Sequence, residues 1–128
     1  MRILALAAAI MVASSGAGLA QDAAAGESRF KSLCFPCHDV GPGAKVKLGP
    51  PLNGLAGRAA GTMPGYNYSD ANKNSGITWS AESFAEYIKN PMQRMPGTKM
   101  AFGGVRDEKD IANLWAFFSQ FDEKGDKK

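Results

Sequence analysis

Apolar side chains recur at helical spacing in three stretches of the chain, and this pattern predicts three main helices. The first spans residues 22–33, and the second begins at the candidate N-cap Ser80 and is stopped by Pro91. The third begins near Asp107, ends before Gly125 and has the clearest apolar stripe. The positions expected on the buried faces are Gly26, Phe30, Leu33, Phe84, Tyr87, Ile88, Ile111, Leu114, Trp115 and Phe118.

The stretches between these helices are rich in glycine and proline and are predicted to be loops. A short helical turn over residues 69–74, closed by Gly76, is the exception. Residues 39–68 and 90–106 form long loops, which a compact domain seldom carries without a functional reason. β-Branched residues are sparse, so the predicted class is all-α with a thin core that needs a further apolar body. The charged tail, residues 123–128, is expected to fray.

The N-terminus has the pattern of a secretory signal peptide. A short basic start is followed by an apolar run from Ile3 to Ala13, and small residues continue to Ala20, where cleavage is expected. An uncleaved membrane anchor is the alternative, but it needs about 20 apolar residues and this run is shorter. We therefore expect a signal peptide over residues 1–20 and one domain over residues 21–128.

Charge is close to balanced, with 15 Lys and Arg against 12 Asp and Glu and a formal net charge of +3. The basic residues are interleaved with acidic ones and form no block, so a nucleic-acid partner is not expected. No later segment of the sequence is hydrophobic enough to span a membrane, and the mature protein is therefore expected not to span one.

The two cysteines and the single histidine of the chain stand together as Cys34-Phe35-Pro36-Cys37-His38. This C-x-x-C-H spacing is the signature of c-type haem attachment. Two thiols about one helical turn apart can each bond to a vinyl group at the haem edge, and the following imidazole can bind the iron. The motif predicts one covalent haem c on Cys34 and Cys37 with His38 as an axial ligand. Such attachment implies a compartment outside the cytoplasm, here the bacterial periplasm.

Other uses of a C-x-x-C pair fit this chain less well. A structural zinc site needs about four Cys or His ligands, and the chain has three in total. A thiol–disulfide oxidoreductase remains an alternative, although its motif belongs near a βαβ pattern that is not predicted here. A disulfide between Cys34 and Cys37 would close a very small loop and stabilise little. An unliganded loop histidine is a poor interpretation directly after C-x-x-C.

The second axial position of the iron decides the function. A second histidine is excluded, because His38 is the only histidine in the chain. Four methionines remain once the signal peptide is removed, namely Met63, Met92, Met95 and Met100. Any of them can instead be a flexible core residue, and composition alone does not separate them. A position left open would indicate a haem enzyme or a gas-binding haem protein.

Residues 22–121 resemble the class I cytochromes c, which include the mitochondrial protein and its soluble relatives in alphaproteobacteria. Besides the cysteine motif, the resemblance rests on Gly49-Pro50, Gly57-Arg58, Tyr68-Ser69-Asp70-Ala71-Asn72-Lys73-Asn74, Gly76-Ile77-Thr78-Trp79 and Pro96-Gly97-Thr98-Lys99-Met100. It implies the cytochrome c fold, with helices and long loops wrapped around one covalently bound haem. It also implies that Met100 is the second axial ligand.

The resemblance further implies roles for residues around the haem. The Pro50 carbonyl would accept the second ring N–H of His38 and fix its tautomer. Two groups of polar and aromatic residues would bind the haem propionates and surround the iron–sulfur bond. They are Arg58, Tyr68 and Trp79 for the propionates, and Asn72, Tyr87 and Thr98 for the iron–sulfur bond. Gly26 and Phe30 would lie where the first helix crosses the last one, against the face around Leu114 and Phe117.

Ligation by His38 and Met100 would leave no open position on the iron, so one-electron transfer is expected and enzymatic catalysis is not. Histidine and methionine ligands also raise the reduction potential. The expected role is that of a soluble, monomeric periplasmic carrier between a donor complex and a terminal acceptor. The sequence does not distinguish among a membrane cytochrome complex, an oxidase, a reaction centre and a periplasmic dehydrogenase as redox partner.

Docking of a partner protein is expected at a positive surface. The residues expected to form it are Lys45, Lys47, Lys99 and Arg106. The family commonly carries a ring of lysines at the exposed haem edge. Several positions where lysine is frequent hold other residues here, namely Leu33, Met92, Gln93 and Asp107. Electrostatic steering toward an acidic partner is therefore expected to be weakened.

Overall fold

The structure is a computed structural model that describes residues 21–128, so the predicted signal peptide lies outside the described residues. Its helices are α1 (Ala23–Leu33), α2 (Asp70–Lys73), α3 (Ala81–Lys89), α4 (Pro91–Arg94) and α5 (Glu108–Phe118). Within this part of the chain, extended pairing is limited to two isolated bridges, and the predicted all-α class is confirmed. None of the described helices is long and apolar enough to cross a membrane.

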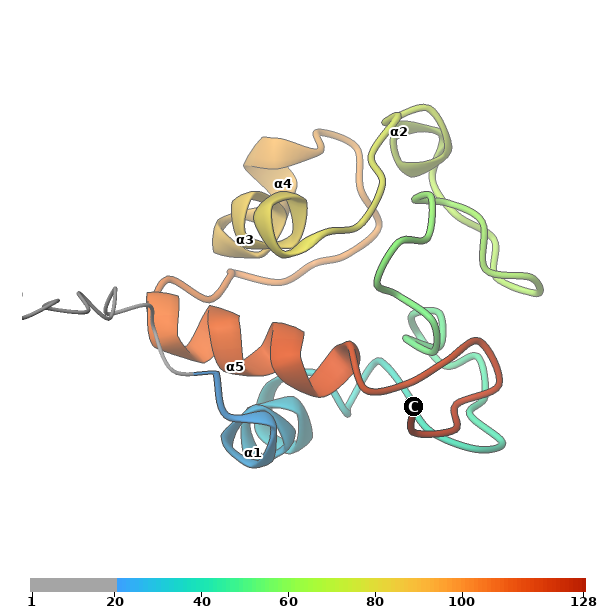
Figure 1. Ribbon diagram of the computed structural model, residues 1–128. Coiled ribbons are helices and arrows are strands. Elements are labelled where there is room, and N and C mark those ends of the chain that lie inside the picture. The colour runs from blue at the N-terminus through green and yellow to red at the C-terminus, as the bar shows by residue number, and fades with distance from the viewer. Residues whose placement is uncertain (1–20) are drawn as a thin grey trace, which may run out of the picture.

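Helices α1 and α5 cross at close range and form one side of the fold (Figure 1). Asp22 caps α1 by accepting hydrogen bonds from the first helical N–H groups, and its own N–H donates to Asn113 Oδ1 at 2.9 Å. A Cβ on Gly26 would lie 1.9 Å from the Asn113 carbonyl oxygen, so only glycine allows this approach. Phe30 packs against Phe117 with ring centroids 5.4 Å apart. The predicted crossing at Gly26 and Phe30 is confirmed.

Two residues expected on buried helix faces are more exposed than predicted. Leu33 is 37% exposed, because α1 ends there and the side chain lies at the edge of a cavity. Trp115 on α5 is only partly buried and packs against Phe84, with ring centroids 5.4 Å apart. Phe117 lies outside the periodic stripe but is buried at the crossing with α1, where it was expected.

Helix α3 begins as predicted at Ser80, whose Oγ accepts from the Ser83 N–H while Ser83 Oγ accepts from the Ser80 N–H. Pro91 does not end helical structure, however, because it stands in the first turn of the short helix α4. Proline is compatible with this position, where helical N–H groups have no internal partner. Asn90 separates the two helices and caps α4 by accepting from the Gln93 N–H at 3.2 Å. The irregular segment predicted after α3 is therefore wrong at its start.

The helical turn predicted after residue 68 is confirmed as α2, where Ser69 Oγ accepts from the Asn72 N–H at 3.1 Å. The segment before it, residues 39–68, contains no helix, as its glycine and proline content predicts. This loop is nevertheless tied to the rest of the molecule by backbone hydrogen bonds. The Gly49 N–H, for example, donates to the Cys37 carbonyl at 2.8 Å and joins the loop to the turn that follows α1.

The C-terminal tail is folded, and the prediction that it frays is wrong. Residues 121–128, here called the C-terminal strap, form a small closed loop. The Asp122 carboxylate accepts hydrogen bonds from the N–H groups of Lys124 and Asp126, each at 2.9 Å. Aspartate commonly organises such turns through its side chain, which orders an otherwise charged segment. The strap, red in Figure 1, lies beside the loop that follows α1.

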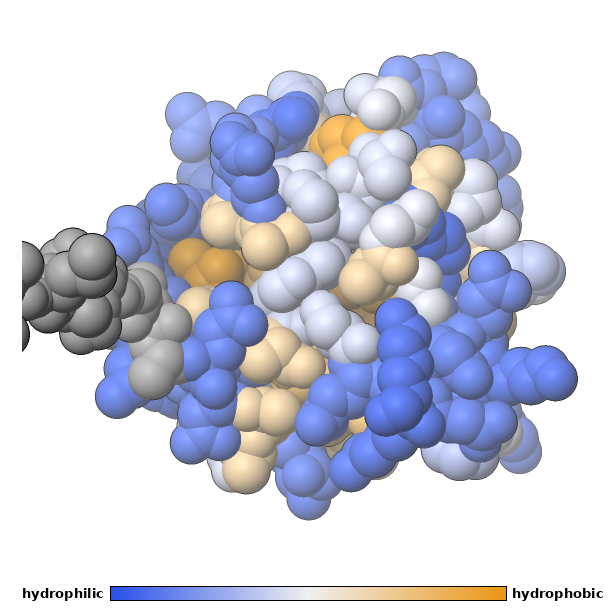
Figure 2. Space-filling view, in the orientation of Figure 1, coloured by the Kyte–Doolittle hydropathy of each residue, from blue (hydrophilic) through white to orange (hydrophobic). Residues whose placement is uncertain are grey.

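The molecular surface seen in Figure 2 is hydrophilic around its periphery, with less polar side chains gathered toward the middle. Five large apolar side chains among the described residues are exposed. They are Leu33, Phe35, Val46, Leu48 and Met92. Leu33 and Leu48 both line the same cavity, so part of this apolar surface belongs to the cavity wall.

Candidate functional site

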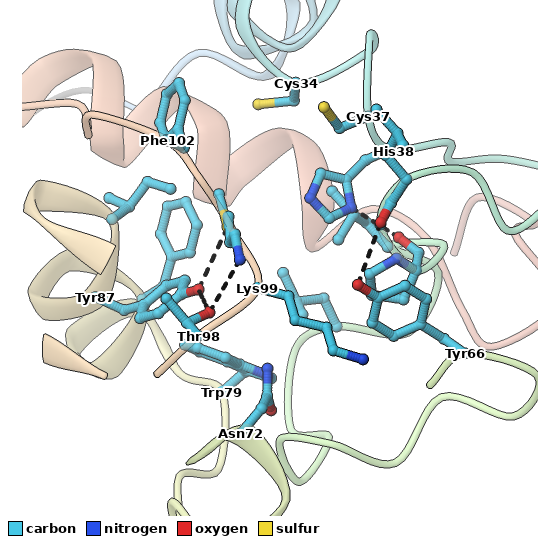
Figure 3. Close-up of a pocket in the computed structure, with 18 of the residues that line it drawn as sticks. Cys34, Cys37, His38, Tyr66, Asn72, Trp79, Tyr87, Thr98, Lys99 and Phe102 are labelled. Atoms are coloured by element: carbon cyan, nitrogen blue, oxygen red, sulfur yellow. Dashed lines mark hydrogen bonds between the residues drawn. The ribbon is translucent and has the colours of Figure 1, made fainter. Parts of the chain in front are cut away.

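A cavity of about 440 Å³ lies among α1, α3, α5 and the two long loops. Its walls are mainly apolar, and a small number of polar side chains reach into it. Figure 3 shows Cys34 and Cys37 at one end of this cavity and Asn72 and Trp79 at the other. An apolar cavity with a few convergent polar groups is the usual form of a cofactor site.

Cys34 and Cys37 stand on the turn that continues from the C-terminus of α1. The N–H groups of Cys37 and His38 donate to the Cys34 carbonyl at 3.0 and 2.8 Å, so the motif forms a tight turn with both sulfurs on the cavity side. Burial, together with the nearby Cys37, raises the pKa of Cys34 to about 11. Reactive thiols of disulfide oxidoreductases have lowered pKa values, so this environment does not favour that alternative.

His38 lies between the cavity and the loop at Gly49 and Pro50, with its ring turned into the cavity (Figure 3). Its Nδ1 is 2.8 Å from the Pro50 carbonyl oxygen, which can only accept, so Nδ1 carries the proton. Burial lowers the pKa of His38 below its ordinary value of 6.5, and the charge of Lys47 acts in the same direction. The imidazole is therefore neutral at pH 7, with Nε2 free to bind a metal.

Met100 lies across the cavity from His38, beside Tyr87 and Thr98. The Tyr87 hydroxyl donates a hydrogen bond to Met100 Sδ at 3.3 Å and is 3.4 Å from Thr98 Oγ1. The Met100 N–H donates to Thr98 Oγ1 at 3.2 Å, which fixes the backbone that carries the sulfur. Figure 3 shows Tyr87 and Thr98 on one side of the cavity and His38 on the other.

The other three methionines of residues 21–128 do not line this cavity. Met95 is 3% exposed and belongs to the hydrophobic core, whereas Met92 on α4 is 53% exposed. Met63 lies in the loop before α2, where its N–H donates to the Tyr68 hydroxyl at 3.2 Å. Of the four candidate methionines, Met100 is therefore the one that lines the cavity.

The three residues predicted to bind propionates all line the cavity. Arg58 Nη1 donates to the Asn53 carbonyl at 2.6 Å, but Arg58 Nε is buried without a hydrogen-bond partner. Burial lowers the pKa of Arg58 and raises the pKa of Tyr68. Trp79 is buried and packs against Tyr87 with ring centroids 5.1 Å apart.

The polar cluster predicted beside Met100 is only partly assembled by direct contacts. Tyr87 and Thr98 meet, as predicted, but Asn72 reaches the cavity from α2 without a hydrogen bond to either of them. Its Oδ1 is buried and has no partner. Asn72 therefore belongs with the polar end of the cavity, near Trp79, as Figure 3 shows.

The residues predicted to dock partner proteins are all exposed, and they are Lys45, Lys47, Lys99 and Arg106. Two of them are bound to neighbouring groups. Lys47 Nζ lies 3.9 Å from the centroid of the Phe35 ring and donates a hydrogen bond to the Phe35 carbonyl. Lys99 Nζ, at the cavity edge, donates to the Asn67 carbonyl at 2.7 Å. The ammonium groups of Lys47 and Lys99 are therefore each held in place by a hydrogen bond.

Two residues at the site were not predicted from the sequence. Tyr66 lines the cavity on the side of His38 (Figure 3), and its hydroxyl donates to the Leu48 carbonyl at 3.2 Å. Asn53 is buried and holds Arg58 through its carbonyl. Both stand in the glycine-rich loop, where no periodic pattern marks a residue as buried or functional.

Comparison with known proteins gives consistent relatives. A family model described as "Cytochrome C oxidase, cbb3-type, subunit III" matches residues 21–118. Cytochrome c2 of Blastochloris viridis is 56% identical over 119 residues, which cover 93% of each chain. Cytochrome c-550 of Bradyrhizobium diazoefficiens is 60% identical over 103 residues, or 80% of this chain and 75% of the relative. Cytochrome c of Cochliobolus lunatus is 46% identical over 99 residues, or 77% and 92%.

The chain belongs to the cytochrome c family. The word "oxidase" in that description refers to the proteins after which the family model is named. The relatives called cytochrome c2 and c-550 are electron-transfer proteins, and this cytochrome c is likewise an electron-transfer protein and not an enzyme. It carries one covalently bound haem c and exchanges electrons with redox partner proteins. The cytochrome c fold implied by the sequence is confirmed.

The described residues fit a haem group. The thiols lie at one end of the apolar cavity, where the vinyl edge would be held, and buried polar atoms lie toward the other end. Arg58 Nε is a buried donor without an acceptor, and a propionate carboxylate would supply one. A Cβ on Gly49 would lie 2.4 Å from His38 Cε1, so glycine at this position leaves space for the imidazole ring.

Proposed function

We propose that this cytochrome c is a periplasmic one-electron carrier in which His38 and Met100 ligate the haem iron. Cys34 and Cys37 would hold the haem covalently. The observation that carries the proposal is that the imidazole and the thioether enter one cavity from opposite sides, each fixed by a hydrogen bond. With both axial positions filled by the protein, the iron has no site for a substrate.

When bound, haem supplies an iron that alternates between the ferrous and ferric states. Met100 would offer a soft thioether, a weak donor that favours the ferrous form and raises the reduction potential. His38 would offer a neutral nitrogen whose direction is set by the Pro50 carbonyl. The apolar cavity wall also disfavours the extra positive charge of the ferric form, because the surrounding dielectric is low.

Three residues support binding of the propionates at the polar end of the cavity. Arg58 has a buried Nε without a partner, and Tyr68 and Trp79 are buried beside it as cavity-lining residues. A carboxylate in a mostly apolar site is costly unless it is paired and hydrogen-bonded, and the guanidinium would meet that need. Asn72, Tyr87 and Thr98 complete the polar surroundings of the haem.

The protein is proposed to act in the periplasm after removal of a signal peptide, residues 1–20. Monomers would diffuse between a donor complex and an acceptor, such as a membrane cytochrome complex, an oxidase, a reaction centre or a periplasmic dehydrogenase. Docking would use the exposed residues near the haem edge, namely Lys45, Lys47, Lys99 and Arg106.

The axial ligation is tested by replacing methionines in the haem-loaded protein. Met100→Ala should abolish the sulfur–iron charge-transfer band, lower the reduction potential and allow small ligands to bind the iron. Met92→Leu is the matched control, because Met92 is exposed and does not line the cavity. Loss of the band in Met92→Leu, or its survival in Met100→Ala, would show that another residue is the ligand.

A further inference from the structure

Two asparagines, Asn53 and Asn113, are buried in the described part of the chain. The Asn53 amide binds both backbone groups of Gly41. Oδ1 accepts from the Gly41 N–H at 2.8 Å, and Nδ2 donates to the Gly41 carbonyl at 2.9 Å. The pair closes the loop of residues 41–53 at its base. Such a buried pair defines a geometry, because leaving either backbone group unpaired would be costly.

The loop that Asn53 closes carries the groups that contact His38. The Pro50 carbonyl lies 2.8 Å from His38 Nδ1. A Cβ on Gly49 would lie 2.4 Å from the imidazole Cε1, so the loop backbone rests directly against the ring. The orientation of the imidazole therefore depends on the shape of this loop, and that shape depends on the closure at its base.

Asn53 also contacts a residue at the polar end of the cavity. Its carbonyl accepts a hydrogen bond from Arg58 Nη1 at 2.6 Å. Arg58 lines the cavity, and its buried Nε is the donor proposed for a propionate. One residue thus contacts the loop of His38 through its side chain and the guanidinium through its backbone.

The C-terminal strap covers Asn53 from the outer side. Gly125 is buried with φ +85°, and a Cβ there would lie 2.1 Å from the Gly41 carbonyl oxygen and 2.6 Å from Asn53 Nδ2. The neighbouring contact is also close, since a Cβ on Gly54 would lie 3.0 Å from the Cα of Glu123. The strap therefore shields the Asn53–Gly41 pair from water, and glycine at 125 permits that approach.

We propose that Asn53, shielded by the C-terminal strap, is a positioning residue. It fixes both the orientation of the His38 ring and the position of the Arg58 guanidinium. The inference rests on the proposed ligation by His38. When the Asn53–Gly41 pair is broken, the loop of residues 41–53 opens more often and admits water. A wetter cavity and a displaced guanidinium both favour the ferric state, so the reduction potential falls.

The first test compares Asn53→Ala with Asn113→Ala in the haem-loaded protein. Asn113 is the matched control because it is also buried but ties Asp22 to α5, away from the cavity. In Asn53→Ala, amide exchange at Gly49 should be roughly ten- to a hundredfold faster, as expected for the loss of both hydrogen bonds to Gly41, and the reduction potential should fall. Asn113→Ala should lower the midpoint of unfolding and leave the potential unchanged. Equal shifts of potential in both variants, or none in either, would overturn the proposal.

The second test acts through the strap and serves if Asn53→Ala does not load haem. Gly125→Ala inserts a methyl against the Asn53–Gly41 pair. Gly65→Ala inserts one at the same φ of +85°, and outside the adjoining residues its nearest neighbour is Val46 Cγ2 at 3.9 Å. Gly125→Ala should speed exchange at Gly49 and lower the reduction potential relative to Gly65→Ala. Identical exchange rates and potentials in the two variants would contradict the role of the strap.

Failure of this inference can be told apart from failure of the proposed function. A spectrum of the unsubstituted protein without histidine ligation would contradict the proposed function. The exchange comparison between Asn53→Ala and Asn113→Ala measures loop closure and does not depend on that spectrum. Unaltered exchange at Gly49 in Asn53→Ala would overturn the positioning role even if His38 ligates the iron.

Discussion

Single hydrogen bonds hold the two groups that face each other across the cavity. The Pro50 carbonyl accepts from His38 Nδ1, and the Tyr87 hydroxyl donates to Met100 Sδ. Burial lowers the pKa of His38 and raises the pKa of Tyr87. At neutral pH the imidazole is therefore uncharged and the phenol is a donor. Both states suit a site in which one nitrogen and one sulfur are offered to a metal.

Removing the Tyr87 hydroxyl should lower the reduction potential of the haem-loaded protein. Its hydrogen bond withdraws electron density from Met100 Sδ, so the sulfur becomes a better donor to ferric iron when the bond is lost. Tyr87→Phe should lower the reduction potential by roughly tens of millivolts. This shift corresponds to part of the ~1 kcal/mol that one hydrogen bond contributes, converted for a one-electron couple. Tyr66→Phe is the control, because its hydroxyl binds the Leu48 carbonyl. An equal or larger shift in Tyr66→Phe would count against this explanation.

The pKa of His38 predicts how stability depends on pH. Because the folded state lowers this pKa below 6.5, the unfolded chain binds the proton more readily. The stabilisation is fully present above pH 6.5 and is lost as the pH falls from there through the folded pKa. Denaturant unfolding should therefore show a free energy that falls as the pH drops below 6.5, where a proton on Nε2 would also compete with the proposed bond to iron. A free energy that stays constant as the pH drops would be the contrary result.

At the scale of elements, hydrophobic periodicity predicts the three long helices but not the short helix α4 or the C-terminal strap. The stripes on α3 and α5 and the caps at Ser80 and Asp107 are local signals, and the structure bears them out. The sequence pattern does not predict helix α4, because Pro91 indicates the end of a helix, although proline also begins helices. The sequence pattern does not predict the ordered C-terminal strap, because its order depends on the Asp122 turn together with the close approach of Gly125 to Gly41 and Asn53, which are far away in the sequence.

The crossing of α1 and α5 should tolerate no side chain at Gly26. A Cβ there would lie 1.9 Å from the Asn113 carbonyl oxygen and 2.9 Å from the Phe117 Cβ, so the helices must separate. Gly26→Ala should lower the free energy of unfolding by about 1–3 kcal/mol in spite of the better helix propensity of alanine. Ser28→Ala on the exposed face of α1 is the control and should change it little. A Gly26→Ala variant as stable as the parent in denaturant titration would refute the close packing.

At the scale of the whole molecule, the sequence predicted the attachment motif but only part of its surroundings. Cys34, Cys37 and His38 follow from a spacing that few other sites require. Met100 was selected by resemblance alone, because composition left four methionines open, and the cavity now adds a positional reason. Asn53 had no local signal, since its role depends on segments brought together by folding.

Docking of partner proteins should depend only moderately on charge. Several positions where the family commonly carries lysine hold other residues here, and exposed charges are screened beyond ~8 Å at physiological salt. Association with a purified redox partner protein, followed by stopped flow, should therefore slow only gradually with added salt. Lys45→Glu should slow association several-fold at low salt, whereas Lys127→Glu on the strap should not. A steep salt dependence, or equal effects of the two reversals, would mean that the docking surface lies elsewhere.

The most direct test of the central claim is the coordination of iron in the oxidised, haem-loaded protein. Iron K-edge X-ray absorption counts the scattering atoms around the metal and separates sulfur from nitrogen by distance. Ligation by His38 and Met100 predicts five nitrogen neighbours, four from the porphyrin and one from imidazole, together with one thioether sulfur. A spectrum without sulfur in the first coordination shell, or with a five-coordinate iron, would contradict it.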